Sequence, residues 1–96
     1  MADVPIGAFA QPVIGGEYTN ISADTLIKSG DGHMIGFNVN STSSGTVVIY
    51  DSLTATGTKI ANTYTPAAGW NAYPAHFKTG LYFDVTGTID LTVIWK

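Results

Sequence analysis

The stretch Thr46-Val47-Val48-Ile49-Tyr50-Asp51 predicts a β-strand more strongly than any other part of this 96-residue chain. β-Branched side chains such as Val and Ile lose rotamer freedom in a helix and pack well on a pleated sheet. Apolar side chains follow one another here, so both faces of the strand are expected to be covered. A strand of this kind is typical of the centre of a sheet.

The residues around this stretch show the same preference for strands. The chain contains seven Val, nine Ile and thirteen Thr residues, and eleven Gly and four Pro residues interrupt it at short intervals. Within residues 33–40, Ile35 and Phe37 alternate with Met34 and Asn38. This alternation predicts a strand with Ile35, Phe37 and Val39 on one face and Met34, Asn38 and Asn40 on the other.

The predicted strands are separated by turn signals rich in Gly, Ser, Thr and Pro at residues 29–32, 41–45, 65–69 and 86–88. Residues 70–74, with two aromatic residues and a proline, are predicted to be irregular. The strands are predicted at residues 17–21, 25–28, 33–40, 46–51, 58–64, 75–78, 81–85 and 89–96. About eight short strands at this spacing predict an all-β fold, an antiparallel β-sandwich that is jelly-roll-like or Ig-like.

Residues 1–16 differ from the rest of the chain. They are apolar, follow neither helical nor strand periodicity, and contain prolines that block a helix and interrupt a ladder. We expect an extended arm, with Gly15-Gly16 as its hinge, ahead of a domain at residues 17–96. Exposed apolar segments usually mark contacts, so the arm either packs on its own domain or docks on a neighbouring subunit. Its candidate interface residues are Val4, Ile6, Phe9, Val13 and Ile14.

Charge is scarce, which limits the possible partners. Only 11% of residues are charged, Arg is absent and the formal net charge is −3. Binding to nucleic acids or to anionic membranes depends on clustered Lys and Arg, so neither partner is expected. The absence of Cys excludes disulfides and thiolate chemistry. The first residues lack the basic region and apolar run of a secretory signal.

Candidate catalytic and metal-binding residues are few. His33 and His76 are the only side chains with unperturbed pKa values near neutrality, and a triad with Asp31 is conceivable, although no nucleophile motif accompanies them. Ca²⁺ at Asp31 with the carbonyls of residues 29–32 is a second possibility. The seven acidic residues are dispersed, mostly at predicted turns or strand ends, where Asp commonly accepts hydrogen bonds from backbone amides. We therefore expect no enzyme activity, no cofactor and no metal.

An aromatic cluster lies within fourteen residues of the chain and contains Tyr64, Trp70, Tyr73, His76 and Phe77. Such a cluster can cover one end of the core, form a subunit interface, where Trp and Tyr are enriched, or stack against a sugar. Trp70 and Tyr73 are the members that we expect at an interface.

Five segments of turn and strand residues carry a resemblance to a known class of proteins. They are Ser29-Gly30-Asp31-Gly32-His33, Gly45-Thr46-Val47-Val48-Ile49-Tyr50-Asp51, Thr54-Ala55-Thr56-Gly57-Thr58-Lys59-Ile60, Phe77-Lys78-Thr79-Gly80-Leu81-Tyr82-Phe83 and Thr86-Gly87-Thr88-Ile89-Asp90-Leu91-Thr92-Val93-Ile94-Trp95. With them, residues 29–96 resemble small β-sandwich structural proteins of tailed bacteriophages, namely capsid decoration (cement) proteins and related head-fibre and tail modules.

The resemblance implies a virion protein without enzyme activity on the outer surface of the capsid. Proteins of this class are often homotrimers that bind the major capsid protein and hold neighbouring capsomers together. The apolar arm fits such a surface clamp. The alternative is a carbohydrate-binding or receptor-contacting module of a phage fibre, with Trp70 and Tyr73 as its platform. A small hydrolase around His33 or His76 is the third hypothesis.

Overall fold

The computed structural model describes residues 16–96, and residues 1–15 lie outside the described part. Within residues 16–96 no helix is long and apolar enough to cross a membrane. The described residues form six β-strands, which are β2 (Glu17–Ile21), β3 (Thr25–Ser29), β4 (Gly32–Asp51), β5 (Thr58–Tyr64), β6 (Gly69–Phe77) and β7 (Gly80–Trp95).

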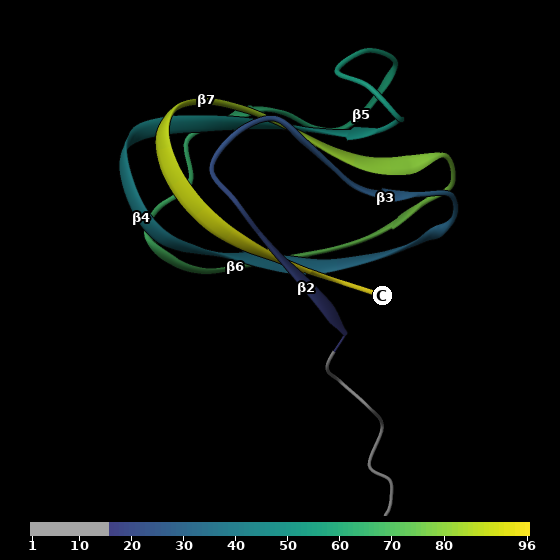
Figure 1. Cartoon of the computed structure of the whole chain (residues 1–96), viewed down its shortest axis with the longest axis horizontal. Coiled ribbons are helices and arrows are strands. Elements are labelled where there is room, and N and C mark those ends of the chain that lie inside the picture. Colours follow the sequence, from purple (N-terminus) through teal and green to yellow (C-terminus); the bar gives the residue numbers. More distant parts are fainter. Residues whose placement is uncertain (1–15) are drawn as a thin grey trace, which may run out of the picture.

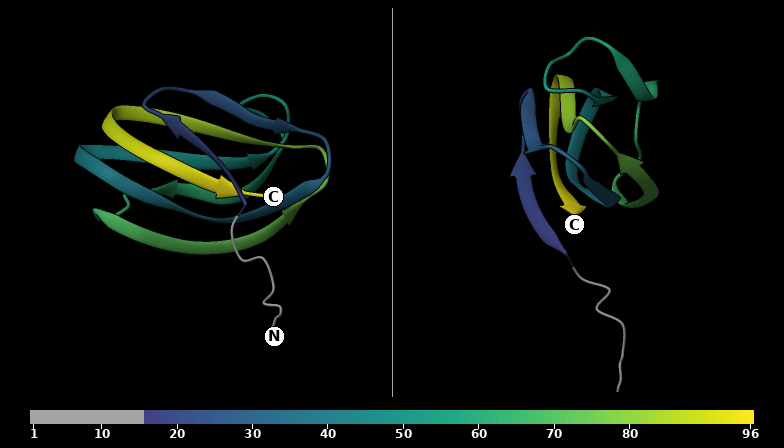
Figure 2. Two further views of the ribbon diagram at one scale, coloured as in Figure 1. Left: turned by 60° about the horizontal axis from the view of Figure 1, so that its bottom comes forward. Right: turned by 90° about the vertical axis from the view of Figure 1, so that its right-hand side faces the viewer.

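The long strands β4 and β7 form one antiparallel pair that extends through the whole fold, from Met34 opposite Trp95 to Asp51 opposite Leu81. The N-terminal half of β4 also pairs with β6, and its C-terminal half pairs with β5. In the same way, the C-terminal half of β7 pairs with β2 and the N-terminal half with β3. The result is one antiparallel sheet, whose two long strands curve back over themselves (Figures 1 and 2).

The prediction of about eight short strands is wrong in its count, because two predicted turns lie inside strands. Residues 41–45 belong to β4, and residues 86–88 belong to β7. The register shifts between Ser43 and Ser44, and both Ser44 and Gly87 have positive φ angles, of 61° and 83°. A bulge bends and twists a strand without ending its pairing. Turn residues therefore bend the two long strands here instead of separating shorter ones.

Gly45 shows how closely β4 and β7 approach each other at this bend. A β-carbon added at Gly45 would lie 2.6 Å from Cβ of Ile89 and 2.9 Å from the carbonyl oxygen of Thr88. Any side chain at this position would push the two strands apart.

A second bulge, at Ile35, changes which residues of β4 face the core. Met34 pairs with Trp95 and Gly36 pairs with Ile94, so Ile35 has no partner on β7. As a result Met34 is buried in the core together with Phe37, whereas Ile35 is only partly buried. The prediction that Met34 and Phe37 lie on opposite faces is therefore wrong. The sequence pattern does not reveal a bulge, because it assumes that side chains alternate without interruption.

The segment predicted to be irregular, residues 70–74, is also part of a strand. It lies in the middle of β6, which pairs only with β4 among the described strands. Pro74 has no N–H to donate to a ladder, but an edge strand tolerates this loss. The proline therefore indicates an edge position rather than a loop.

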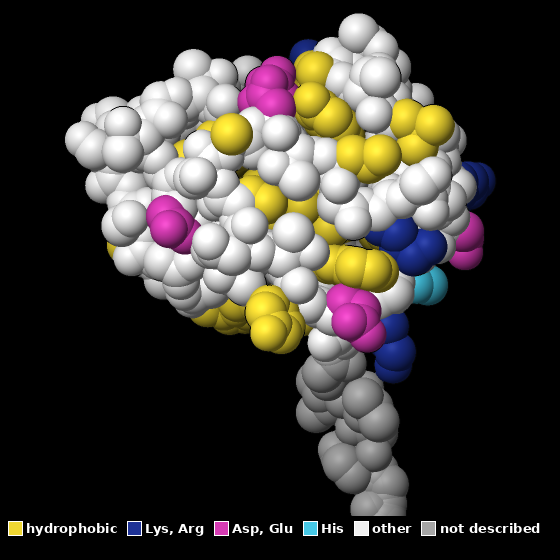
Figure 3. All heavy atoms as spheres, in the orientation of Figure 1, with side chains coloured by type: hydrophobic (Ala, Val, Ile, Leu, Met, Phe, Trp, Pro, Cys, Tyr) yellow, Lys and Arg dark blue, Asp and Glu magenta, His cyan; other side chains and the backbone are white. Residues whose placement is uncertain are grey.

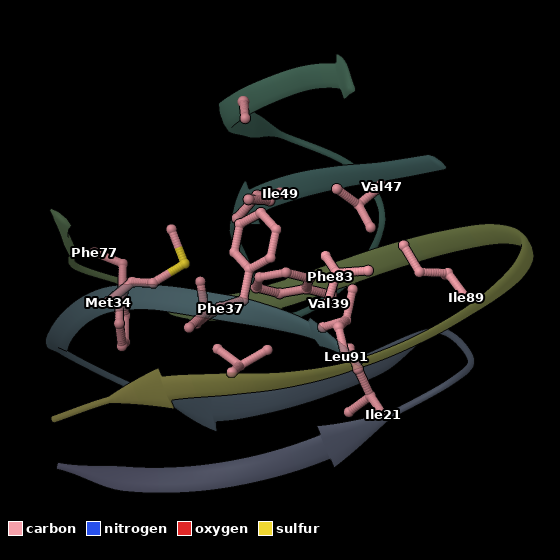
Figure 4. Close-up of a cluster of buried hydrophobic side chains, with 13 residues drawn as sticks. Ile21, Met34, Phe37, Val39, Val47, Ile49, Phe77, Phe83, Ile89 and Leu91 are labelled. Carbon is pink, nitrogen blue, oxygen red and sulfur yellow. The ribbon is translucent and has the colours of Figure 1, made fainter. Parts of the chain in front are cut away.

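The core lies on the concave side of the curved sheet. Phe37 of β4 and Phe83 of β7 are fully buried and meet edge to face, with ring centroids 5.7 Å apart and an interplanar angle of 85°. Aromatic pairs favour this geometry. Figure 4 shows side chains from the two arms of the curved sheet pointing toward one another. The buried cluster contains Ile21, Met34, Phe37, Val39, Val47, Ile49, Ala61, Phe77, Leu81, Phe83, Ile89, Leu91 and Val93.

Two aspartates hold turns by accepting hydrogen bonds from backbone amides, which confirms the prediction for these acidic residues. The Asp51 carboxylate accepts from the amides of residues 78–80, at distances of 2.8–3.3 Å. Asp24 accepts from the amide of Val85 at 2.7 Å. Partial burial acts to raise the pKa of Asp51, but the three backbone amides outweigh it and hold this pKa below its ordinary value.

We expect Phe83→Ala to lower the free energy of unfolding by about 3–5 kcal/mol, because it removes a fully buried ring and leaves a cavity. Urea unfolding followed by circular dichroism measures this loss. Tyr18→Ala removes an aromatic side chain that is 76% exposed, so its effect is expected to stay within about 0.5 kcal/mol. Equal losses in the two variants would contradict the described core.

Asp51→Asn is expected to lower the free energy of unfolding by about 1–2 kcal/mol near neutral pH, because the amide cannot replace the charge-assisted hydrogen bonds to residues 78–80. The folded-state pKa of Asp51 is depressed, so its contribution is complete above the unfolded-state pKa of about 3.9. It is lost as the pH falls through the folded-state pKa. Urea unfolding from about pH 7 to about pH 2 should therefore show the two proteins converging, and a constant difference would argue against this explanation.

Candidate functional site

The candidate site is the outer face of the half-sheet formed by β2, β7, β4 and β6. The strand register places two rows of residues across this face, and they alternate along the strands with core residues such as Leu91 and Val93. The rows are Tyr18–Ile94–Gly36–Ala72 and Asn20–Thr92–Asn38–Trp70. Together with Asn40 and Asp90 beside them, we call this surface the Trp70 face. Neighbouring strands lie about 4.8 Å apart, so each row spans about 14 Å.

Trp70 is the largest exposed side chain of this face, with 53% of its surface accessible. Its indole rests on the backbone of Gly36, where an added β-carbon would lie 2.9 Å from both Cζ2 and Cη2. A glycine within a strand often marks such a close approach. The missing side chain of Gly36 therefore gives the indole a support, while more than half of Trp70 stays open to solvent.

A hydrogen-bonded network of uncharged amides and one carboxylate lies beside Trp70. Asn20 of β2 and Asn40 of β4 both donate through Nδ2 to Oδ1 of Asp90, at 2.7 and 2.9 Å. The same two amides donate to Oγ1 of Thr92, at 3.3 and 3.1 Å. Asn38 donates in turn to Oδ1 of Asn40 at 2.9 Å. The network links three strands and orients every side chain in it.

The network leaves oxygen atoms free to accept further hydrogen bonds. Within residues 16–96 no side chain or backbone group donates to Oδ1 of Asn20, Oδ1 of Asn38 or Oδ2 of Asp90. The side-chain hydrogen bonds from Asn40 and Asn20 also hold the pKa of Asp90 below its ordinary value. The Trp70 face thus combines an apolar indole with an ionised carboxylate and several acceptors.

The two register rows contain no Lys, and Asp90 is the single charged side chain of the Trp70 face. Charged groups are also few on the side of the molecule that Figure 3 shows, and most of them lie toward its right-hand end. At the end of the face away from Trp70, Tyr18 is 76% exposed and pairs with the partly buried Ile94. No pocket is found on the surface of residues 16–96, so this candidate site is an open face.

The structure separates the two predicted interface residues that it describes. Trp70 points outward, whereas Tyr73 packs against the core and donates its hydroxyl to the carbonyl oxygen of Ile60 at 3.3 Å. Because side chains alternate along β6, the two rings lie on opposite sides of the strand. The prediction of a shared Trp70–Tyr73 platform is therefore wrong. The other predicted interface residues lie outside the described part and are Val4, Ile6, Phe9, Val13 and Ile14.

The two histidines and Asp31 do come together, at one end of the sheet. His33 and His76 are register partners on β4 and β6, and their rings stack with centroids 4.7 Å apart. Nε2 of His76 lies 2.6 Å from Oδ1 of Asp31, and both side chains are well exposed, at 45% and 70%. Within residues 16–96 no three His, Asp or Glu side chains are arranged to hold a metal ion.

The turn at residues 29–32, the candidate for Ca²⁺ binding, interacts with a cation from the chain itself. Nζ of Lys28 donates to the carbonyl oxygens of Ser29 and Asp31, at 3.4 and 2.9 Å. The carboxylate of Asp31 faces His76 instead. Two carbonyls of this turn and the Asp31 carboxylate therefore have partners within the protein.

Sequence reasoning did not single out Asn20, Asn40 and Asp90 as a group. Alternation along residues 33–40 and 89–96 does place Asn38, Asn40, Asp90 and Thr92 on the polar faces of their strands. However, the pairing that brings them together joins residues 50 and 70 positions apart, and no local pattern encodes such a pairing.

Comparisons with protein-family models, with curated proteins and with solved structures give no match to this chain.

We expect Asn40→Ala to raise the pKa of Asp90 toward the ordinary value of an aspartate, because it removes the first of the two side-chain hydrogen bonds that hold this pKa low. NMR titration of the Asp90 carboxyl carbon measures the change. Asn71→Ala is the matched control, because Asn71 bonds to Ala67, Gly69 and Tyr64 and not to Asp90. A pKa of Asp90 that stays the same in Asn40→Ala would show that the network does not stabilise the carboxylate.

Proposed function

We propose that this chain is a bacteriophage capsid decoration (cement) protein without enzyme activity. It binds the outer surface of the capsid, contacts the major capsid protein and stabilises contacts between capsomers. We further propose that it acts as a homo-oligomer, a trimer, and that residues 1–16 are its main attachment segment.

The observation that carries the proposal is the position of β2. This strand directly follows the apolar arm, and among the described residues it pairs with β7 alone. An edge strand presents a row of backbone N–H and C=O groups to which another chain can add. Charged side chains often guard such edges, but β2 carries only one, Glu17. An apolar segment that leads directly into such an edge is well suited to contact with a neighbouring subunit or a capsid shell.

We also propose that the curved sheet is a β-sandwich. Each layer would contain one half of β4, one half of β7 and two short strands, β2 and β6 in one layer and β3 and β5 in the other. The contact between Phe37 and Phe83 supports this description, because the two rings come from different layers and meet in the core. It is also the architecture that the resemblance to phage structural proteins implies.

The scarcity of charge supports the proposal as well. With 11% charged residues and no Arg, the chain carries few of the groups that keep a small protein dispersed in water. A protein that stays attached to a large assembly covers part of its surface and needs fewer of these groups. The resemblance of residues 29–96 to decoration proteins points to the same conclusion.

Removal of residues 1–15 is expected to weaken binding to capsids by about tenfold or more, because each buried Val, Ile or Phe side chain contributes about 1.5–3 kcal/mol. The truncation leaves every strand of the described fold intact. Co-sedimentation with capsids that lack the protein measures binding, and light scattering measures the oligomeric state.

Phe9→Ser tests the apolar character of the arm without shortening it, and Leu26→Ala alters a side chain of the sheet that is 41% exposed and serves as the control. We expect weaker capsid binding in the first variant and unchanged binding in the second. A full-length protein that stays monomeric, or a truncated protein that binds capsids as tightly as the full chain, would rule out the proposed clamp.

A further inference from the structure

We propose that the Trp70 face is a binding site for a neutral carbohydrate. This function is separate from attachment to a capsid, since it depends on residues of β2, β4, β6 and β7 and not on the arm. The inference rests on the juxtaposition of an exposed indole, which lies against Gly36, with hydrogen-bond acceptors from the amides of Asn20 and Asn38 and the carboxylate of Asp90.

The indole supplies the apolar part of the site. The face of an aromatic ring carries partial negative charge and its edge partial positive charge. One face of a pyranose ring presents several C–H groups with weak positive polarisation, so it complements the ring face in both shape and charge. Trp70 is 53% exposed, and the contact with Gly36 fixes its position before any ligand binds. A support of this kind reduces the entropy that binding would otherwise cost.

The amide network supplies the polar part of the site. The amide groups of Asn20 and Asn40 and one N–H of Asn38 already donate within the network. The acceptor oxygens of Asn20, Asn38 and Asp90 receive no hydrogen bond from the described residues. Such a surface needs a ligand that donates hydrogen bonds. The hydroxyl groups of a sugar are donors, and they project from the rim of the ring whose apolar face would lie on Trp70.

Charge selects among the possible ligands. The two register rows contain no Lys, and the Asp90 carboxylate is ionised. An anionic ligand such as a phosphate, a sulfated glycan or a sialic acid would therefore meet a negative charge without any compensating cation. A neutral hydroxylated ligand avoids this repulsion and uses the acceptors fully.

The dimensions of the face fit a chain of sugars rather than a single ring. A row of four strands spans about 14 Å, with Trp70 at one end and Asn20 at the other. Tyr18 extends the neighbouring row at the end away from Trp70 and is 76% exposed. It offers a second aromatic surface for a longer oligosaccharide.

The test uses the full-length chain on an array of neutral glycans, followed by native gel electrophoresis in the presence of the soluble neutral polysaccharide whose repeat scores best. We expect binding that changes little with salt, because no ion pair contributes. Dextran sulfate is the anionic comparison and should not bind. Trp70→Ala is expected to weaken binding about tenfold or more, and Trp70→Phe should retain part of it.

Leu26→Ala, on the other half of the sheet, is the matched control and should bind as the unaltered chain does. Thermal unfolding of Trp70→Ala checks that the fold is intact, and Asn20→Ala tests the polar part independently of the indole. The protein without residues 1–15 should keep its glycan binding, so this proposal and the proposed capsid attachment fail separately.

Three results would overturn the proposal. They are an array without any neutral glycan bound, binding to dextran sulfate alone, and unchanged glycan binding in Trp70→Ala. The first result can also be accompanied by a shift of the oligomeric state in Trp70→Ala. Such a shift would assign the Trp70 face to contact between copies of this chain.

Discussion

The pairing between β4 and β7 is the interaction on which the rest of the structure depends. It runs continuously from Met34 and Trp95 to Asp51 and Leu81, and every other described strand pairs with one of these two. The two strands belong to both halves of the fold only because they bend. The bend requires the positive φ angles of Ser44 and Gly87 and the absence of a side chain at Gly45. Residues that usually end strands here allow two strands to continue.

The same residue types can end a strand or bend it, and this limits how much of the fold the sequence predicts. Composition and alternation predict an all-β, antiparallel protein, and the strand at residues 58–64 is placed as the structure has it. Local patterns cannot tell a turn at residues 41–45 from a bend, because both favour the same small and polar residues. Whether residues 41–45 end the strand or only bend it depends on whether β7 pairs with them, and no local pattern shows such a pairing.

The same limit applies to the candidate site. Trp70 could be singled out from the sequence, since it belongs to a dense aromatic cluster. The predicted pairing of Trp70 with Tyr73 is wrong, because side chains alternate along β6 and residues three positions apart face opposite sides of the sheet. The partners that the structure does place beside Trp70 come from strands far away in the chain. Asn38 is its register neighbour, and Asn20 and Asp90 complete the polar surface.

The long-range pairing of β2 has a consequence for how the protein is made. Residues 17–21 pair only with residues 91–95 among the described strands, so β2 has no partner until residues 91–95 have been synthesised. Folds dominated by contacts between distant residues form slowly and expose unpaired strands for longer. β2 must therefore stay soluble without its partner while the residues between the two strands are added.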